Sequence, residues 1–426
     1  MKNPHRKITG CALLLTLVFS GCSTHWSTSK RGSRDRAYIV YWPSSDSGRT
    51  RVAVKDLIDM KGVVTTAGSE FLAKNSPPAA RDAACLRIAR ARGVQFVGKT
   101  NLTELAVGVS GINDYFGTPK NPVNPKRKLI PGGSSSGSAV AVSNGTADIA
   151  IGTDTAGSIR VPAACCGIVG LKTTFGLVPL DGVYPIAPNH LDTVGPMARD
   201  VAHTVQGMDL LQEGFAGRYS RARAAKPSAG MIKVGRLHLS NTNPKVDRAV
   251  DGALSKTGFK VVTLDKAFQE KWNQAEKDGK TVAAASAWLS DQKFNHQNGV
   301  TIRTMAIVAL GAFEYHTNYR AALKRQAAWK ATLRQVFKKV DFIALPTLQT
   351  LPPTFSLFGG SPAFEALVLG QQNTAAVNFA GNPALAMPIP VEDKTVHVTS
   401  LQLVGPRLSE AALLNAGRLV EARCSR

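Results

Sequence analysis

The sequence predicts an α/β fold built around a mixed sheet, and three observations support this expectation. Short apolar runs typical of strands, such as 94–97 and 149–151, alternate with segments whose apolar residues have helical spacing. Glycine-, serine- and proline-rich turns separate these segments. The chain has 426 residues, of which 44% are hydrophobic and 19% charged, which is enough for a large core. Strands alternating with helices pack as α/β layers.

The expected elements follow in chain order. Strands are expected at 52–58, 94–97, 149–151, 260–263, 341–345, 384–388 and 400–404, and helices at 79–92, 139–144, 374–380 and 409–422. Gly93 is placed to end the first helix, and Ser409 to cap the last one. Residues 171–200 are expected to form strands and turns that close over a site, and residues 201–330 to be mostly helical.

The N-terminus has the pattern of an export signal. Lys2, Arg6 and Lys7 precede a short apolar run, Cys11–Phe19, which is too short to span a bilayer permanently. Small residues then precede Cys22, an arrangement that resembles a bacterial lipoprotein signal.

This resemblance divides the chain into a signal peptide at 1–21, a polar tether at 22–50 and a catalytic domain at 51–425. It implies lipidation at Cys22 and therefore attachment to a membrane face. The expected location is the periplasm or the cell envelope, and Ser23 favours the outer membrane.

The composition limits the classes of partner. A formal net charge of +23 indicates either an anionic partner or a solvated basic surface. No RNA- or DNA-binding motif accompanies this charge, so a nucleic-acid ligand is not expected. The cysteines beyond Cys22 are too few for a disulfide framework, and no zinc-site spacing is present.

The stretch 131–170 contains the candidate chemistry. Two glycine- and serine-rich turns, Gly132–Ser138 and Gly152–Gly157, flank an apolar stretch. Consecutive backbone N–H groups in such a turn can form an oxyanion hole. Ser158 follows the second turn directly, where a nucleophile would lie.

This stretch reads G-G-S-S-S-G-S and then G-T-D-T-A-G-S-I-R-V-P, with V-K-D-L-I-D and V-G-K-T-N-L-T-E upstream. It resembles the amidase signature family of serine hydrolases, and the resemblance covers roughly residues 50–425. The resemblance implies an α/β/α sandwich with a large central mixed sheet. It also implies acyl transfer without a cofactor or a metal ion.

The resemblance also implies a catalytic set. Matched by position, Ser158 is the nucleophile, Ser134 the bridging serine after a cis peptide bond, and Lys99 the base. Lys99 would need a lowered pKa to accept a proton. The backbone N–H groups of Thr155, Ala156, Gly157 and Ser158 would hold the oxyanion, and supporting roles fall to Ser135, Asp154 and Arg160.

Two positions depart from the family pattern. Ser136 and Ala156 stand where the family has glycine, which raises the question of whether these positions need glycine backbone angles. The resemblance to other members at both positions argues that activity is retained.

Three alternatives remain beside this interpretation. Residues 133–137 fit G-x-S-x-G, which would make Ser135 the nucleophile of a Ser–His–Asp hydrolase. Residues 93–100 fit the phosphate-binding loop, although the intervening residues are strand-like. A basic lipoprotein that binds an envelope polymer without catalysis is the third.

The expected function is therefore an exported serine amidase. It would hydrolyse a small linear amide or a peptide amide to a carboxylate and ammonia or an amine. The sequence indicates neither the substrate nor the oligomeric state.

Overall fold

The computed structural model describes residues 34–43, 48–355 and 360–424, and these described residues form one compact unit. The predicted signal peptide, Cys22 and the first part of the predicted tether lie outside the described residues. None of the helices in these ranges is both long and apolar enough to cross a bilayer.

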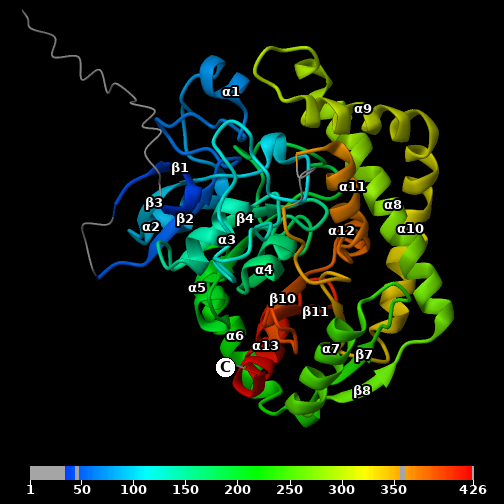
Figure 1. Cartoon of the computed structure of the whole chain (residues 1–426). Helices are drawn as coiled ribbons and strands as arrows, with labels where there is room; N and C mark the ends of the chain where they lie inside the picture. The colour runs from blue at the N-terminus through cyan, green and yellow to red at the C-terminus, as the bar shows by residue number, and fades with distance from the viewer. Residues whose placement is uncertain (1–33, 44–47, 356–359, 425–426) are drawn as a thin grey trace, which may run out of the picture. The chain divides into compact units, whose positions relative to one another are not determined.

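A mixed sheet of eleven strands forms the centre of the described chain (Figure 1). The strands are β1 Tyr38–Tyr41, β2 Arg51–Lys55, β3 Gln95–Thr100, β4 Ile149–Asp154, β5 Val169–Lys172, β6 Thr193–Ala198, β7 Lys233–Arg236, β8 Lys260–Thr263, β9 Phe342–Pro346, β10 Ala384–Pro390 and β11 Val398–Val404. Their order across the sheet is β1-β3-β2-β4-β6-β5-β10-β11-β9-β7-β8. The strands β2, β3 and β4 run parallel, as do β7, β8 and β9.

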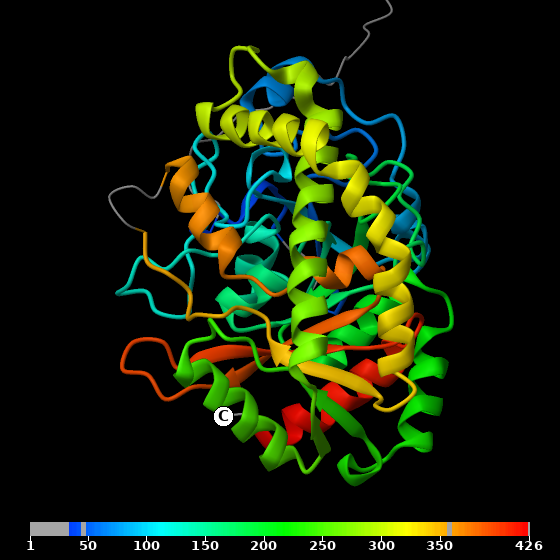
Figure 2. The ribbon, with the colours of Figure 1, turned by 90° about the vertical axis from the view of Figure 1, so that its right-hand side faces the viewer.

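Thirteen α-helices accompany the sheet in the described ranges. They are α1 Glu70–Asn75, α2 Arg87–Ala91, α3 Ser136–Ser143, α4 Arg160–Cys166, α5 Val201–Leu211, α6 Phe215–Ala225, α7 Pro244–Thr257, α8 Lys266–Asp291, α9 Ile302–Thr317, α10 Tyr319–Val336, α11 Pro362–Gly370, α12 Ala375–Ala380 and α13 Glu410–Cys424. The long helix α8 contacts α9, α10 and α12, and Figure 2 shows it in front of the sheet.

Alternation along the strands divides the core between two faces of the sheet, because successive strand residues point to opposite sides. In β10, Leu385 and Met387 pack with α5 and α13 in one cluster, whereas Ala386 packs with α3 and α4 in another. A third cluster extends this second face under α8, α10 and α12 and contains Trp272 and Trp329. These layers confirm the predicted α/β/α sandwich.

Most predicted elements appear close to their expected positions, with three corrections. Tyr38–Tyr41, assigned to the tether by the sequence, is the edge strand β1, paired with β3. The helix expected at 79–92 is confined to a 3₁₀ turn at Ala84–Leu86 and α2, which follow the pair Pro77-Pro78. Ser409 directly precedes α13, but its hydroxyl donates to the carbonyl of Pro406 rather than capping the helix.

Candidate active site

Ser134 and Ser158 lie side by side, each just before a short helix. The peptide bond between Gly133 and Ser134 is cis, as the resemblance implies, and α3 begins two residues later. The N–H of Ser135 donates to the carbonyl of Ser158 at 3.2 Å, which joins the two turns. Ser134 is fully buried, whereas Ser158 keeps 6% of its surface exposed. Ser158 is therefore the more accessible of the two hydroxyls.

Lys55, at the end of β2, is the cation that contacts Ser134. Its Nζ donates to Ser134 Oγ at 2.7 Å and to Thr153 Oγ1 at 2.8 Å. The side chain is fully buried. Burial lowers the pKa of Lys55 to about 7, although the carboxylates of Asp154 and Asp192 act in the opposite direction. The amine can therefore be neutral near physiological pH.

The lysine that contacts Ser134 is Lys55 and not Lys99, which corrects the assignment made from the sequence. Its Nζ donates to the carbonyl of Ile58 at 2.7 Å and to Thr65 Oγ1 at 3.1 Å. It also lies 2.8 Å from Asp56 Oδ1 in a fully buried ion pair. The ammonium of Lys99 is thus held by a carboxylate partner away from the serines.

The strand register explains why the two lysines diverge. A bulge shifts the pairing of β2 and β3 between Val52 and Ala53, so that Lys99 lies beside Val54. Val54 belongs to the core cluster on the α5 and α13 face. Lys55 instead lies beside Thr100, whose hydroxyl contacts Ser138 of α3 at 2.7 Å. Lys55 therefore reaches the serine face and Lys99 the opposite one.

The turn after β4 holds backbone N–H groups beside Ser158. Gly157 N–H donates to Asp154 Oδ1 at 2.8 Å, so this group is already bound, which corrects its assignment to the oxyanion hole. In the part of the chain that the structure describes, the N–H groups of Thr155, Ala156 and Ser158 make no hydrogen bond. These three remain available to a developing oxyanion.

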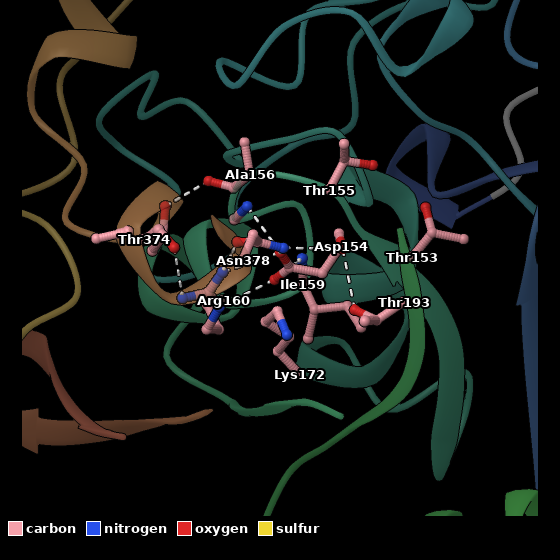
Figure 3. A network of polar contacts seen from close by, with 12 residues as sticks. Thr153, Asp154, Thr155, Ala156, Ile159, Arg160, Lys172, Thr193, Thr374 and Asn378 are labelled. Atoms are coloured by element: carbon pink, nitrogen blue, oxygen red, sulfur yellow. Dashed lines mark hydrogen bonds and ion pairs between the residues drawn. The ribbon is translucent and has the colours of Figure 1, made fainter. Parts of the chain in front are cut away.

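A buried ion pair braces this turn (Figure 3). Arg160 donates to Asp154 Oδ2 through Nε at 3.0 Å and to Oδ1 through Nη2 at 2.9 Å. Asn378 of α12 donates to Asp154 Oδ1 at 2.9 Å. Burial raises the pKa of Asp154, but the charge and hydrogen bonds of Arg160 outweigh it and lower the pKa to about 2. Asp154 and Arg160 thus occupy the bracing positions that the sequence predicted.

The two departures from the family pattern leave the backbone unstrained. Neither Ser136 nor Ala156 has a positive φ. Gly157 has φ +137°, and a Cβ there would lie 2.4 Å from Thr374 Oγ1, so this position requires glycine. Thr374 also donates to the carbonyl of Ala156 at 2.5 Å, which holds the turn from the side of α12 (Figure 3).

Ser135 is placed to support the end of β4 and not to act as a nucleophile. Its hydroxyl is fully buried and donates to the carbonyl of Thr153 at 3.3 Å. A Ser–His–Asp set would need a histidine at this hydroxyl. Lys99 lies within β3, so the glycine–lysine pattern at 93–100 forms a strand rather than a phosphate-binding loop.

Sequence reasoning missed three contributors to the site: Lys55, Thr153 and Thr374. A signal for Lys55 was present, because this lysine lies in V-K-D-L-I-D, one of the stretches that carry the resemblance to the amidase signature family. Nothing in the sequence distinguishes Thr153 and Thr374 from other polar residues. The packing of β4 and α12 brings Thr153 into contact with Lys55 and Thr374 into contact with Ala156.

Comparison with known proteins decides the family. A family profile described as Amidase matches residues 51–414. The chain belongs to the amidase family. The chain is 32% identical over 409 residues to a component of the glutamyl-tRNA(Gln) amidotransferase of Halobacterium salinarum, covering 87% of this chain and 95% of that protein. It is 33% identical over 391 residues to 2-amino-5-chloromuconic acid deaminase of Comamonas testosteroni, covering 87% and 80%.

Solved structures show the same architecture. The chain superposes on the corresponding component of the glutamyl-tRNA(Gln) amidotransferase of Thermotoga maritima with a TM-score of 0.75 and 25% identity, covering 92% of this chain and 88% of that one. A structure described as an amidase gives a TM-score of 0.73 and 27% identity, covering 88% and 85%. The fold and the family are therefore established, and the chemistry is argued from the site.

Proposed function

We propose that this amidase hydrolyses a linear carboxamide through an acyl-enzyme on Ser158, with Ser134 as the bridging serine and Lys55 as the base. The contact of 2.7 Å between Lys55 Nζ and Ser134 Oγ is the observation on which the proposal depends. Burial and the lowered pKa of Lys55 support a base that is neutral at working pH.

The proposed proton path starts from the contact between Lys55 and Ser134 and takes Ser158 as the next hydroxyl along it. Neutral Lys55 accepts the proton of Ser134 Oγ, which accepts the proton of Ser158 Oγ as this oxygen attacks the amide carbonyl. The resulting oxyanion binds the free N–H groups of the turn after β4. The proton returns through Ser134 to the leaving nitrogen, and ammonia or an amine departs. Water then attacks the ester, and Ser158 regains its proton as the carboxylate leaves.

Water is the proposed acceptor of the acyl group. Among the relatives, the amidotransferases act on glutamyl-tRNA(Gln) by name, and the Comamonas relative is a deaminase. A deaminase releases nitrogen from its substrate, whereas an amidotransferase transfers it to an acceptor. The predicted export signal favours hydrolysis over the supply of ammonia to an amidotransferase.

Labelling with a fluorophosphonate tests the nucleophile. We expect the wild type to react, Ser158→Ala to lose the label, and Ser135→Ala to keep it. Release of ammonia from a panel of primary amides should follow the same order. A label that survives in Ser158→Ala but disappears in Ser135→Ala would transfer the nucleophile to Ser135. An unreactive wild type would favour a binding protein on an amidase fold.

Export and lipidation at Cys22 form a separate proposal, which rests on the sequence alone. Intact mass of the protein recovered from cell envelopes would test it. The expected product begins at Cys22 and gains the mass of its lipid groups, and Cys22→Ala abolishes both changes. A full-length chain in the soluble fraction would contradict export.

A further inference from the structure

Asp291 is a buried carboxylate with one oxygen that no described residue satisfies. The residue ends α8 and is 1% exposed. Its Oδ1 accepts hydrogen bonds from the Tyr184 hydroxyl at 2.6 Å and from Ser290 Oγ at 2.9 Å. Its Oδ2 has no hydrogen-bond partner among the described residues. Burying a carboxylate oxygen without a hydrogen-bond partner costs free energy of folding, and a ligand with a hydrogen-bond donor would offset this cost.

The position of Asp291 adds two further costs. A carboxylate in the last turn of a helix faces the negative end of the helix dipole. A second buried acid, Asp192, lies within electrostatic range. Burial raises the pKa of Asp291 to about 6 and the charge of Asp192 adds to this effect, while Tyr184, Ser290 and Lys293 oppose it. An acid at this place does not stabilise its helix.

Asp192 connects this acid to the catalytic turn. Its Oδ1 accepts the hydroxyl of Thr155 at 2.7 Å, and its Oδ2 accepts the N–H groups of Ile186 and Ala187 at 3.0 and 2.9 Å. Asp192 is also within electrostatic range of Lys55.

The segment that binds Asp192 also holds Asp291. Tyr184 donates its hydroxyl to Asp291, and its N–H donates to the carbonyl of Leu57 at 2.8 Å, two residues beyond Lys55. Hydrogen bonds therefore connect both acids to residues next to the proposed catalytic ones. Asp192 is bound to Thr155, and Asp291 is connected through Tyr184 to Leu57. Lys293, the remaining charged group facing Asp291, precedes Phe294, and its ammonium lies over the Phe294 ring.

We propose that Asp291, supported by the charge of Asp192, binds a protonated amino group on the amide substrate. This inference rests on the proposed function and deepens it: the favoured substrates are amides that also carry an amine. A cationic donor would satisfy Asp291 Oδ2 and offset the repulsion between the two carboxylates.

Binding can be measured without turnover in the Ser158→Ala background. Calorimetry would compare 4-aminobutanamide and 6-aminohexanamide with butanamide and hexanamide. We expect at least one amino amide to bind about ten-fold more tightly than its neutral counterpart. Adding Asp291→Asn should remove that difference while leaving the affinity for the neutral amide unchanged. Tyr184→Phe, which keeps the carboxylate, should preserve the preference.

The alternative is a purely structural role for Asp291. If the role is structural, Asp291→Asn changes the melting temperature but leaves the ratio of the affinities for amino and neutral amides unchanged. Equal affinities for amino and neutral amides in the Ser158→Ala protein would overturn the proposal. Calorimetry measures binding directly, so these results are separate from the test of the nucleophile: release of ammonia by the Ser158→Ala protein would contradict the proposed catalysis, whereas equal affinities would contradict this inference.

The pH dependence of the ratio gives a second readout. Amino amides stay protonated well below pH 7, whereas Asp291 loses its charge as the pH falls through about 6. The preference for the amino amide should therefore decline between pH 7 and pH 5. A preference that is constant over this range would assign it to a group other than Asp291.

Discussion

Lys55 and Lys99 lie on neighbouring strands, yet their ammonium groups reach opposite faces of the sheet. Lys55 Nζ contacts Ser134 at 2.7 Å, and Lys99 Nζ contacts Asp56 at 2.8 Å. Both side chains are fully buried, so burial alone does not distinguish them. Their partners do: Lys55 contacts the hydroxyls of Ser134 and Thr153, whereas Lys99 is paired with the carboxylate of Asp56.

Replacing each lysine by methionine should separate these roles. Lys55→Met removes the base but buries an apolar side chain of similar size, so we expect kcat to fall by about 10²–10⁴-fold with the fold retained. Activity assays together with thermal unfolding would check this result. Wild-type turnover in Lys55→Met would remove Lys55 from the mechanism.

Lys99→Met is the matched control. It leaves Asp56 buried without its cation, which should cost about 3–5 kcal/mol in the free energy of unfolding. The protein that remains folded should still react with a fluorophosphonate at Ser158. Loss of labelling at unchanged stability would instead return the role of base to Lys99.

The activity should depend on pH through Lys55. Because the neutral amine is the base and its pKa is about 7, kcat/KM should rise with pH and level off above about 8. Below pH 7 it should fall about ten-fold per unit as Lys55 becomes protonated. The rate of fluorophosphonate labelling should have the same profile. A rate that is flat from pH 5.5 to 8.5 would contradict a lysine base of this pKa.

Lys172 predicts a pH dependence of stability that is separate from catalysis. Its buried Nζ donates to the carbonyls of Thr173 and Asn382 at 2.9 and 2.8 Å, and Figure 3 shows it near Arg160. Burial, followed by the charge of Arg160, lowers the pKa of Lys172 to about 7. Between about pH 7 and 10.4 the unfolded chain therefore binds one more proton at this site.

Each such lysine should therefore add to the slope of stability against pH in this window, by up to about 1.4 kcal/mol per unit, whereas the buried thiols of Cys85 and Cys165, whose pKa burial raises to about 12, oppose it above about pH 8.5. Lys172→Met should reduce the slope by about one proton, and Lys55→Met should do the same, since the pKa of Lys55 is lowered in the same direction. Urea unfolding at several pH values between 7 and 9.5 measures the slope. Parallel curves for wild type and Lys172→Met would refute the shift.

The sequence predicted the sheet and most strands because these depend on local pattern, whereas Ser134 and Ser158 were chosen through the resemblance to the amidase signature family. The strand run at 149–151 appears where expected, but β4 continues through Gly152 to Asp154, so the second predicted turn begins only at Thr155. The choice between Lys55 and Lys99 depends instead on a bulge in β3 that shifts the register with β2. One residue of shift moves a side chain to the other face of a sheet, and a pattern of residue types does not reveal it.

The supporting residues depend on contacts between distant segments. Thr374 reaches Ala156 across more than 200 residues of sequence, and Asp291 meets Tyr184 across more than 100. The sequence likewise does not reveal the hydrogen bond from Gly157 N–H to Asp154, although both residues were predicted to belong to the site. Motif spacing locates the turn but does not show which of its N–H groups are already bound.

Asp154→Asn tests whether the braced turn is needed for catalysis. Both oxygens of Asp154 accept hydrogen bonds, from Gly157 and Asn378 at Oδ1, from Ile159 at Oδ2 and from Arg160 at both. An asparagine would direct an NH₂ group at some of these donors and leave the buried Arg160 without its counter-charge. We expect about 3–5 kcal/mol loss of stability and, where the protein is still folded, about 10²-fold loss of kcat.

Asp247→Asn provides a control for that loss of stability. Asp247 of α7 pairs at 2.6 Å with the buried Arg236 of β7, at the other end of the sheet, and Arg236 has a second carboxylate partner in Asp251 at 2.7 Å. This variant should unfold at a lower temperature and keep its kcat, because the N–H groups of Thr155, Ala156 and Ser158 stay in place. If Asp154→Asn also keeps its kcat below its unfolding temperature, the turn holds its geometry without the ion pair. Asp154 would then act on stability alone.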